Sequence, residues 1–580
     1  MHRILSKKFV ILAVLMALII ITGVWLMTSK ESNNEEIPYM GHGGAFKNPL
    51  AEIDTPDPSI VYRDGYYYMT FTHNGTDVMV MKSRTLDFHQ AQRKVIWYPP
   101  VDTRYSANIW APEIQYLRGK WYIYFAADDG HNENHRMYVL EADTEDPLGT
   151  YSFKGQLTDD TDKWAIDGLV LEHDNQLYYI WSGWEGEVNI AQNTYIAAMS
   201  DPLTVSGPRI LLSKPDMEWE RAGGPPYINE GQAILQKDGR VFLMYSGAGS
   251  WTPFYSLGML TLEPGDDPLV ASNWKKSKQP LLQMDDEAGV YGPGHNTFVS
   301  SPDGTEEWIV YHATSGIHDG WNNRKARAQK IVWDEEGNPQ IGKPLALDSA
   351  IPVPSGTGVF KAEHAVIRGD RLEFDLIPSS VETKAPLMIR YRNSADMAQA
   401  ITIWINDKQV DELELPVTES ETIGYIYSSI PLQLQAGSNK IGIGTTGSSV
   451  HIHSIELPRY EAEAAQTHGN GEAIVNPFSS GWGVARLTEG DGEMLSFDHT
   501  VVPRSGTYQI ALAMSNPSEQ AIKVELKVNG GQKKLITIPP TDRNIYKPIK
   551  LEIKLESGDN RITLNNASGR LDIDYMDITF

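Results

Sequence analysis

The pattern of hydrophobic and polar residues repeats five times between residues 45 and 350. In each repeat a turn-forming pair precedes a run of aromatic and β-branched residues, which is typical of a β-hairpin. The five segments are Asp64-Gly65 to Phe71, Arg118-Gly119 to Phe125, Asp174-Asn175 to Trp181, Asp238-Gly239 to Tyr245 and Asp303-Gly304 to Tyr311. Their last aromatic residues are about 54 to 66 positions apart, which is room for one four-stranded sheet. No long amphipathic helical pattern interrupts the repeats, so we expect an all-β fold, a five-bladed β-propeller.

A short segment upstream of each hairpin is predicted to form the innermost strand of its blade, and these segments are unexpectedly polar. They are Pro56-Asp57-Pro58, Trp110-Ala111-Pro112-Glu113, Ile166-Asp167-Gly168, Asn229-Glu230-Gly231 and Gly294-His295-Asn296. Three carboxylates and one histidine precede their hairpin aromatics by 14 to 16 residues: Asp57, Asp167, Glu230 and His295. Equivalent positions in a radial fold surround one axis, so these side chains are expected to converge. Glu113, at an offset of 12, is expected to be structural or peripheral.

Converging carboxylates predict a particular chemistry. They cannot all ionise freely in a partly desolvated site, so their pKa values should separate into those of an acid and a base. Hydrolysis of a glycosidic bond needs such a pair. Aromatic residues that could pack on sugar rings flank the same segments, namely Trp110, Trp164, Trp184, Trp219, Tyr227 and Trp251. A glycan-binding propeller without catalysis, a lectin or adhesin, is the alternative, although binding alone does not need both an acid and a base.

The amino-acid composition excludes some classes of binding partner and of chemistry. The chain has 580 residues and a formal net charge of −25, which argues against a nucleic-acid partner because phosphates are bound by basic surfaces. It has no Cys, which excludes disulfides, thiolate metal sites and a cysteine nucleophile. Stability is therefore expected to come from packed cores.

The amino terminus predicts export. Phe9 to Met27 is an uncharged apolar run long enough to span a bilayer as a helix, and Arg3, Lys7 and Lys8 precede it. The run is longer than the core of most signal peptides and lacks a small-residue cleavage site, so an uncleaved signal anchor is favoured over a cleaved signal peptide. The protein is expected outside the cell, either anchored to the membrane or secreted.

The carboxy-terminal third changes pattern after Pro354. It consists of short alternating strands with Gly and Asn turns, which indicates β-sandwiches. The predicted domains are an anchor and linker at 1–36, the propeller at 37–356, and sandwich modules at 357–457 and 458–580.

The five polar segments, in their order and spacing, resemble those of glycoside hydrolase family 43 over roughly residues 45–355. The resemblance implies a five-bladed propeller that hydrolyses arabinose- and xylose-containing plant polysaccharides with inversion. It implies that Asp57 is the general base, that Glu230 is the general acid, and that Asp167 tunes the pKa and orientation of the acid.

The resemblance also implies further site residues. His295 matches a position associated in the family with a hydrated calcium ion on the axis, which His295 would contact through waters. Arg324 resembles the substrate-contacting arginine of the family, with Arg327 close enough to be an alternative. Trp110 and Trp164 are expected to contact substrate. No organic cofactor is expected.

The last module resembles carbohydrate-binding modules of families 6 and 35. The resemblance rests on Tyr460-Glu461-Ala462-Glu463, Gly506-Thr507-Tyr508 and Leu571-Asp572-Ile573-Asp574-Tyr575. It implies that the first and last strands bring acidic residues together around a structural calcium ion. The expected ligands are Glu461, Glu463 and Asp574, with Asp577 competing for the last position.

The leading hypothesis is an exo-acting α-L-arabinofuranosidase that releases arabinose from arabinan or arabinoxylan, held to the plant polymer by its modules. Within the resemblance, the segments around Tyr227, Trp184 and Trp251 are most similar to those of extracellular α-L-arabinofuranosidases. A β-xylosidase and an endo-arabinanase are the alternatives within the same family.

Overall fold

The computed structural model describes the chain from residue 45 to residue 579 with short gaps. The gaps are residues 348, 350, 380–382, 386, 419–422, 430–431, 436, 446–448, 458–459, 477–478, 480–482, 503–504 and 557. The predicted membrane span, Phe9 to Met27, lies outside the described residues. Within them, no helix has both the length and the apolar character needed to cross a membrane.

Nearly all regular structure in the described residues is β-strand. The helical pieces there are 3-10 turns of three residues each: η1 (Asn132–Asn134), η2 (Trp219–Arg221), η3 (Ala271–Asn273), η4 (Ala362–His364) and η5 (Ala462–Ala464). The expectation of an all-β chain is therefore confirmed for this part of the sequence.

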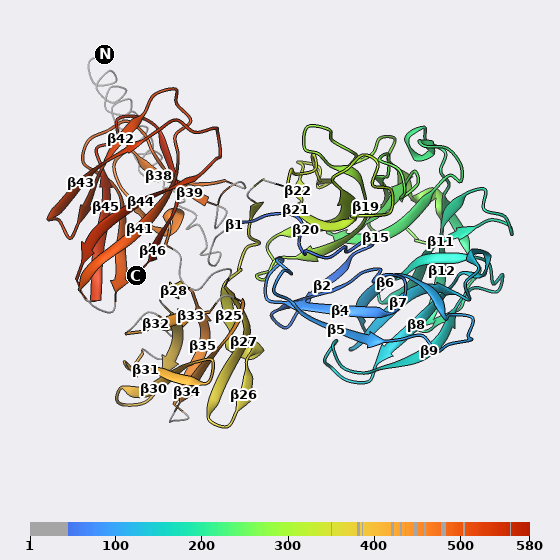
Figure 1. Ribbon diagram of the computed structural model, residues 1–580, viewed down its shortest axis with the longest axis horizontal. Coiled ribbons are helices and arrows are strands. Elements are labelled where there is room, and N and C mark those ends of the chain that lie inside the picture. Colours follow the sequence, from blue (N-terminus) through green and yellow to red (C-terminus); the bar gives the residue numbers. More distant parts are fainter. Residues whose placement is uncertain are drawn as a thin grey trace, which may run out of the picture. The chain divides into compact units, whose positions relative to one another are not determined.

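Five antiparallel sheets follow one another through the first part of the chain, coloured blue to green in Figure 1. The first contains β2 (Ser59–Arg63), β3 (Tyr66–Thr70), β4 (Val78–Ser83) and β5 (Gln92–Trp97), and the second contains β6 (Ala107–Leu117), β7 (Lys120–Asp128), β8 (Arg136–Ala142) and β9 (Tyr151–Leu157). The third contains β10 (Ala165–His173), β11 (Gln176–Trp184), β12 (Gln192–Asp201), β13 (Thr204–Val205) and β14 (Ile210–Ser213). The fourth contains β15 (Asn229–Lys237), β16 (Arg240–Gly247), β17 (Ser256–Leu262) and β18 (Lys275–Lys276), and the fifth contains β19 (Tyr291–Ser300), β20 (Glu307–Thr314) and β21 (Lys325–Lys330).

The first two strands of every sheet form the hairpin that the turn-forming pairs predict. In four of them both turn residues have positive φ, as at Asp64 (52°) and Gly65 (80°). Two such residues match the right-handed twist of the flanking strands, which is why Asp, Asn and Gly recur there. Local turn chemistry thus sets the register of each hairpin.

The five sheets close into a ring. The first strands contact one another in the order β2, β6, β10, β15 and β19, and β19 contacts β2. Five hydrophobic clusters fill the spaces between neighbouring sheets, including the space between the fifth sheet and the first, where Trp308 packs with Met69 and Phe71. Each sheet is therefore covered on both faces, and its first strand lies on the inside of the ring.

Two strand pairs finish this part of the chain. β1 (Ala45–Phe46) pairs with β24 (Ile351–Pro352), and β22 (Val332–Trp333) pairs with β23 (Pro339–Gln340). The pairing of β1 with β24 brings residues separated by about 300 positions to one edge of the ring.

Two pairs of sheets make up the rest of the chain. The first pair consists of β25 (Val359–Lys361), β35 (Val450–Glu456), β29 (Met388–Asn393) and β32 (Gly424–Tyr427), against β26 (Val366–Arg368), β27 (Arg371–Ser379), β34 (Gly437–Thr445), β30 (Gln399–Ile405) and β31 (Lys408–Leu415). A short pair, β28 (Thr383–Ala385) and β33 (Leu432–Leu434), adjoins it in sequence. The second pair consists of β38 (Gly471–Val475), β39 (Gly483–Leu487), β46 (Leu571–Thr579), β41 (Gly506–Ser515), β44 (Lys547–Leu555) and β36 (Tyr460–Glu461), against β37 (Gln466–Thr467), β40 (Glu493–Val502), β45 (Gly558–Asn565), β42 (Ile522–Val528) and β43 (Gln532–Ile538). Each pair shares one apolar core, as a β-sandwich does, in agreement with the predicted sandwiches.

Candidate functional site

Each inner strand of the ring has an irregular backbone at or just before its polar segment. Within each polar segment one residue adopts a left-handed φ: Asp57 (56°), Ala111 (41°), Asp167 (54°), Gly231 (61°) and His295 (43°). In β6, β10, β15 and β19 the ladder register shifts at the same place. Such bulges break the normal alternation of side chains and redirect them. Left-handed non-glycine residues are costly, and they cluster where a site requires them.

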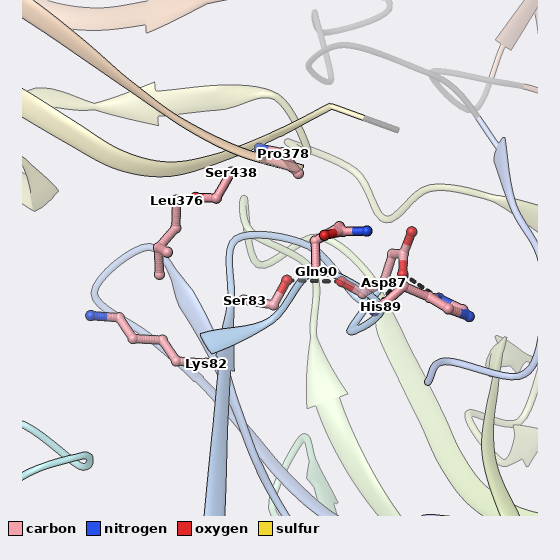
Figure 2. A pocket seen from close by; sticks show the side chains of 8 residues that line it. All are labelled: Lys82, Ser83, Asp87, His89, Gln90, Leu376, Pro378 and Ser438. Atoms are coloured by element: carbon pink, nitrogen blue, oxygen red, sulfur yellow. Dashed lines mark hydrogen bonds and ion pairs between the residues drawn. The ribbon is translucent and has the colours of Figure 1, made fainter. Parts of the chain in front are cut away.

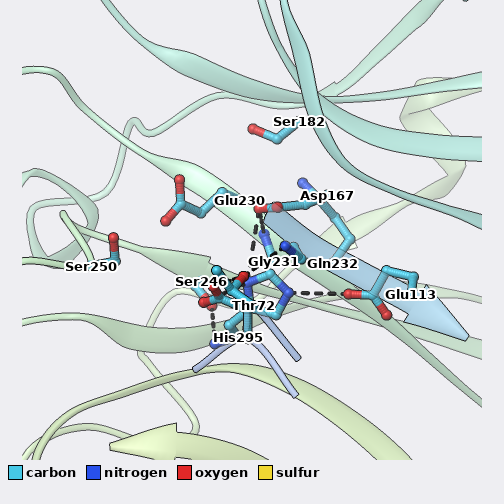
Figure 3. Close-up of polar contacts among 12 residues, drawn as sticks. Thr72, Glu113, Asp167, Ser182, Glu230, Gly231, Gln232, Ser246, Ser250 and His295 are labelled. Atoms are coloured by element: carbon cyan, nitrogen blue, oxygen red, sulfur yellow. Dashed lines mark hydrogen bonds and ion pairs between the residues drawn. The ribbon is translucent and has the colours of Figure 1, made fainter. Parts of the chain in front are cut away.

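The polar side chains of the inner strands meet around His295 (Figure 3). Its Nε2 lies 3.1 Å from Oε1 of Glu113, and its Nδ1 lies 3.5 Å from Oδ1 of Asp57 and 4.0 Å from Oδ2 of Asp167. The backbone N–H of Gly231, next to Glu230, donates to Oδ2 of Asp167 at 2.8 Å. All five sheets therefore contribute to one cluster, including the second, whose Glu113 the sequence predicts to be structural or peripheral.

Asp57 is held as a carboxylate. Nη1 of Arg324 donates to its Oδ1 at 3.1 Å, and the Thr72 hydroxyl donates to its Oδ2 at 2.7 Å. Burial alone would raise the pKa of Asp57, but the charges of Arg324 and His295 outweigh it and hold this pKa well below its usual range. Asp57 is thus ionised at neutral pH, which is the state a general base needs.

Glu230 has the opposite environment. The residue is 8 % exposed, and the Tyr255 hydroxyl donates to its Oε1 at 3.0 Å. Burial and the negative charge of Asp167 raise the pKa of Glu230 to about 8. Burial also raises the pKa of Asp167 to about 6, against the opposing effect of His295. Glu230 is thus protonated at neutral pH and poised to donate.

His295 balances the negative charge of the cluster. Burial alone would lower its pKa, but the carboxylates of Asp167, Asp57 and Glu113 raise it to about 10. The imidazolium explains how three carboxylates, two of them buried, can share the inside of the ring, because buried charges must be paired.

The cluster includes residues that the sequence did not single out as partners. Oε1 of Glu113 is hydrogen-bonded to Nε2 of His295. His312 accepts the backbone N–H of Asp57 at its Nδ1, at 3.0 Å, and stacks on Tyr255 with ring centroids 5.6 Å apart and planes at 8°. His312 directly follows the hairpin residue Tyr311, a position that could have been noticed, whereas Tyr255 lies in a loop that carries no repeat signal.

Of the two candidate arginines, only one reaches the cluster. Arg324 contacts Asp57, as described above. Arg327 is 1 % exposed and donates from its Nη2 to the carbonyl of Thr314 and the hydroxyl of Ser315. The geometry favours Arg324 for the predicted substrate contact.

The two tryptophans predicted to contact substrate differ in their surroundings. Trp164 is buried, stacks on Trp184 at 4.6 Å and 9°, and donates from its Nε1 to the carbonyl of Asn132 at 2.8 Å. These contacts favour a core role for Trp164 over the predicted substrate contact. Trp110 is half-buried, stacks on His135 at 4.0 Å and 25°, and stays a candidate.

The predicted calcium ions can be compared with the ligands that the chain offers. Among the described residues, no group of three or more His, Asp or Glu side chains is arranged to hold a metal directly. Next to His295, both polar atoms of the buried Asn296 amide lack a hydrogen-bond partner in the described part of the chain. Such a group would be satisfied by the waters of a hydrated ion, so the axial calcium stays a prediction that the residues fit.

In the last module, the acidic residues predicted to bind calcium lie in or next to its first and last strands. β36 pairs with β46, so that Glu461 is opposite Tyr575. Glu463 is in η5 and Asp574 is in β46, and both side chains are buried, at 8 % and 4 % exposure. Calcium binding by this group stays a prediction.

A pocket of about 230 Å³ lies apart from this cluster (Figure 2). It is lined by Lys82, Ser83, Asp87, His89, Gln90, Leu376, Pro378 and Ser438. Its one carboxylate, from Asp87, is engaged by the backbone N–H and the Nδ1 of His89. Its lining has no second carboxyl group to act with Asp87, so the cluster around His295 is the candidate active site.

Comparison with known proteins places these observations in a family. A family model described as "Glycosyl hydrolases family 43" matches residues 46–339, and one described as "Carbohydrate binding module (family 35)" matches residues 458–580. The chain is 37 % identical to an "Extracellular exo-alpha-(1->5)-L-arabinofuranosidase" of Streptomyces avermitilis, over 53 % of this chain and 65 % of the relative. It is 36 % identical to a protein of the same name from Streptomyces chartreusis, over 46 % of this chain and 82 % of the relative.

A solved structure gives the same result. The crystal structure of an α-L-arabinofuranosidase from Lactobacillus brevis matches with a TM-score of 0.50 and 33 % identity, over 52 % of this chain and 98 % of that one. The matching part of this chain spans a little under two thirds of the Streptomyces avermitilis relative. The chain belongs to family 43 of the glycosyl hydrolases.

Proposed function

We propose that the protein is an inverting exo-α-L-arabinofuranosidase that releases L-arabinofuranose from arabinan or arabinoxylan. The observation that carries this proposal is the opposite ionisation of two carboxyl groups in one cluster, with the pKa of Asp57 lowered and that of Glu230 raised to about 8. A glycan-binding protein has no need of that difference. We infer that the closed ring of five sheets is a five-bladed β-propeller, which the contacts of its inner strands support.

The proposed reaction uses each carboxyl group once. The Glu230 carboxyl donates its proton to the glycosidic oxygen as the bond to the anomeric carbon breaks. The Asp57 carboxylate accepts a proton from the water that attacks that carbon from the opposite face. Asp57 then releases its proton to solvent, and Glu230 takes up a proton from solvent, so that both groups return to their starting states. Asp167 keeps the pKa of Glu230 high, and Arg324 keeps Asp57 ionised and oriented.

The choice of arabinofuranose rests on the relatives. The two Streptomyces proteins and the Lactobacillus brevis structure bear arabinofuranosidase names at 33 to 37 % identity. A β-xylosidase or an endo-arabinanase would use the same acid and base, so the substrate has to be measured rather than deduced from the cluster.

The assay compares three substrates with the full chain: an aryl α-L-arabinofuranoside, an aryl β-xyloside and debranched arabinan. We expect release of arabinose from the first and third, with arabinose as the only early product from the polymer. Early oligosaccharides would favour an endo-arabinanase, and release of xylose alone would favour a β-xylosidase. Absence of any release would contradict the proposal.

The stereochemistry provides a second test. Proton NMR of the first product should show β-L-arabinofuranose before mutarotation, because a single displacement inverts the anomeric carbon. An α-anomer as the first product would require a covalent intermediate and would contradict the assigned role of Asp57.

The remaining assignments are part of the same proposal. The protein acts outside the cell on plant cell-wall polysaccharide, and the family 35 module holds it to the polymer, which raises the effective substrate concentration. A calcium ion near His295, held through waters and the Asn296 amide, would add positive charge inside the ring. Isothermal titration of the metal-stripped chain with calcium tests both this ion and the one predicted in the module.

A further inference from the structure

Five loops, one in each sheet, join the second strand to the third, and those of the first, fourth and fifth sheets contact the candidate active site. They span residues 71–77, 129–135, 185–191, 248–255 and 315–324. Three residues of these loops contact the acid or the base directly: Thr72 and Arg324 contact Asp57, and Tyr255 contacts Glu230. The chemical character of these loops therefore determines what can lie next to the reacting bond.

Exposed apolar side chains occur on only some of these loops. In the described part of the chain, large exposed hydrophobic residues lie on the loops of the third, fourth and fifth sheets: Val188, Ile190, Phe254, Ile317 and Trp321. The loops at 71–77 and 129–135 carry none. Of the three loops that contact the acid or the base, those at 248–255 and 315–324 thus carry exposed apolar side chains and the one at 71–77 does not.

Trp321 is the largest of these exposed residues, and its orientation is fixed by three contacts. Its Nε1 donates to the hydroxyl of Ser250 at 3.1 Å, and its ring meets Trp251 edge to face, with centroids 5.8 Å apart and planes at 76°. Its carbonyl accepts from Nε of Arg324 at 3.2 Å, and Nη1 of the same arginine binds Asp57. The residue remains 62 % exposed, although the only polar atom of its indole is hydrogen-bonded.

The loop that contacts this indole also contacts the acid. Ser250 and Trp251 belong to the same loop as Tyr255, whose hydroxyl binds Glu230. Figure 3 draws Ser250 in one close-up with Glu230 and His295. A general acid lies next to the leaving group, so a loop that contacts the acid also borders the sugar that leaves.

We propose that Trp251 and Trp321 form a binding site for the sugar residue that leaves, with the apolar face of its ring packed on the Trp321 indole. A furanose ring buries about the area that one indole offers, whereas a protein partner needs a far larger surface. This inference rests on the proposed function, because it assigns the substrate residue that follows the arabinose being released.

The test compares two substrates that differ only beyond the scissile bond. An α-1,5-linked arabinotriose places a sugar on the indole, and α-L-arabinofuranosyl fluoride does not. We expect Trp321→Ala to lower kcat/KM for the triose about tenfold, mainly through KM, and to leave the value for the fluoride unchanged within about twofold. Trp321→Phe should restore part of the loss, because it keeps an aromatic face.

Tyr98→Ala is the matched control. Tyr98 is an exposed aromatic residue that directly follows β5, and its replacement should leave both substrates unaffected. An equal loss on triose and fluoride in Trp321→Ala, or no loss on the triose, would overturn the inference while the wild-type activity still supports the proposed function. A wild-type protein that cleaves neither substrate would overturn both.

Discussion

At the scale of single residues, Asp57 and Glu230 show how one functional group acquires two roles. Both are carboxyls inside the same ring, yet Asp57 has an arginine as its nearest charge, whereas the charge that acts most strongly on Glu230 is the carboxylate of Asp167. Desolvation acts on both, so the difference comes from the charged neighbours. Asp167 is central, because its charge raises the pKa of Glu230.

The pH dependence of kcat/KM should follow the ionisation of Glu230. The acid works only when protonated, so kcat/KM should fall as pH rises through about 8, the pKa of Glu230. Asp167→Asn removes a charge that raises this pKa, and the alkaline limb should then move to lower pH. The measurement is kcat/KM against pH with an aryl arabinofuranoside. An unmoved limb in the variant would show that Asp167 does not tune the acid.

Replacement of Tyr255 should shift the alkaline limb of the pH profile in the opposite direction, to higher pH. Its hydroxyl donates to Glu230 and lowers the pKa of that carboxyl. Tyr255→Phe keeps the ring that stacks on His312 but removes the donor, so the alkaline limb should move to higher pH. The kcat for substrates with poor leaving groups should fall about tenfold, because the acid loses a fixed orientation. A loss of activity with an unchanged pH profile would indicate a purely structural role.

Sequence reasoning located Asp57, Asp167, Glu230 and His295 because they recur at nearly one offset from a strong hairpin signal. It undervalued Glu113, since the bulge in β6 displaces that residue from the common offset. It missed Tyr255, because a contact made from an irregular loop leaves no periodic trace in the sequence.

At the scale of elements, the bulges of the inner strands position the site. Gly231 has a φ of +61°, and a Cβ there would lie 3.0 Å from the ring of His295. Glycine is therefore required at this position for two reasons. It tolerates the positive φ, and its lack of a side chain leaves room for His295. In β19, a Cβ on Gly294 would lie 2.2 Å from the Tyr255 ring, so that glycine makes room for the partner of Glu230.

Gly231→Ala and Gly304→Ala separate these two requirements. Both positions have positive φ, so Gly304→Ala should lose about 1 kcal/mol of stability, measured by denaturant unfolding, and Gly231→Ala should lose more, because its methyl group also meets His295. A methyl group on Gly304 would have no atom within 4 Å, so that variant should keep full activity, whereas Gly231→Ala should lose activity by displacing His295. Equal activities in the two variants would show that the position of His295 is not critical.

The β-hairpins and the sandwich strands were the part of the structure that the sequence predicted best. The hairpins rest on two-residue turns whose chemistry is local, and the sandwich strands alternate visibly between apolar and polar residues. The left-handed residues at the start of the inner strands were not predictable, because Asp57, Ala111 and Asp167 adopt a φ that only the closed ring imposes.

At the scale of the whole molecule, catalysis and attachment to the polymer are assigned to different parts of the chain. The family 43 match ends at residue 339 and the family 35 match begins at residue 458. If the last module holds calcium, the metal should raise its melting temperature, because a ligand that binds only the folded state stabilises it.

Calorimetry of the full chain with and without calcium tests this expectation. We expect calcium to raise one unfolding transition, and the double variant Glu463→Gln, Asp574→Asn to abolish the increase. Glu519→Gln, which alters an exposed carboxylate in the same module, should behave as the wild type. An increase that persists in the double variant would place the calcium elsewhere.

The central claim is that Glu230 donates the proton and Asp57 activates the water. It is tested most directly by kcat/KM for a series of aryl α-L-arabinofuranosides whose phenols differ in acidity, measured with Glu230→Gln and Asp57→Asn. Glu230→Gln should lose about 10³-fold on the poorest leaving group and little on the best, which needs no protonation, while Asp57→Asn should lose activity uniformly. A uniform loss in Glu230→Gln, or a leaving-group dependence confined to Asp57→Asn, would contradict these roles.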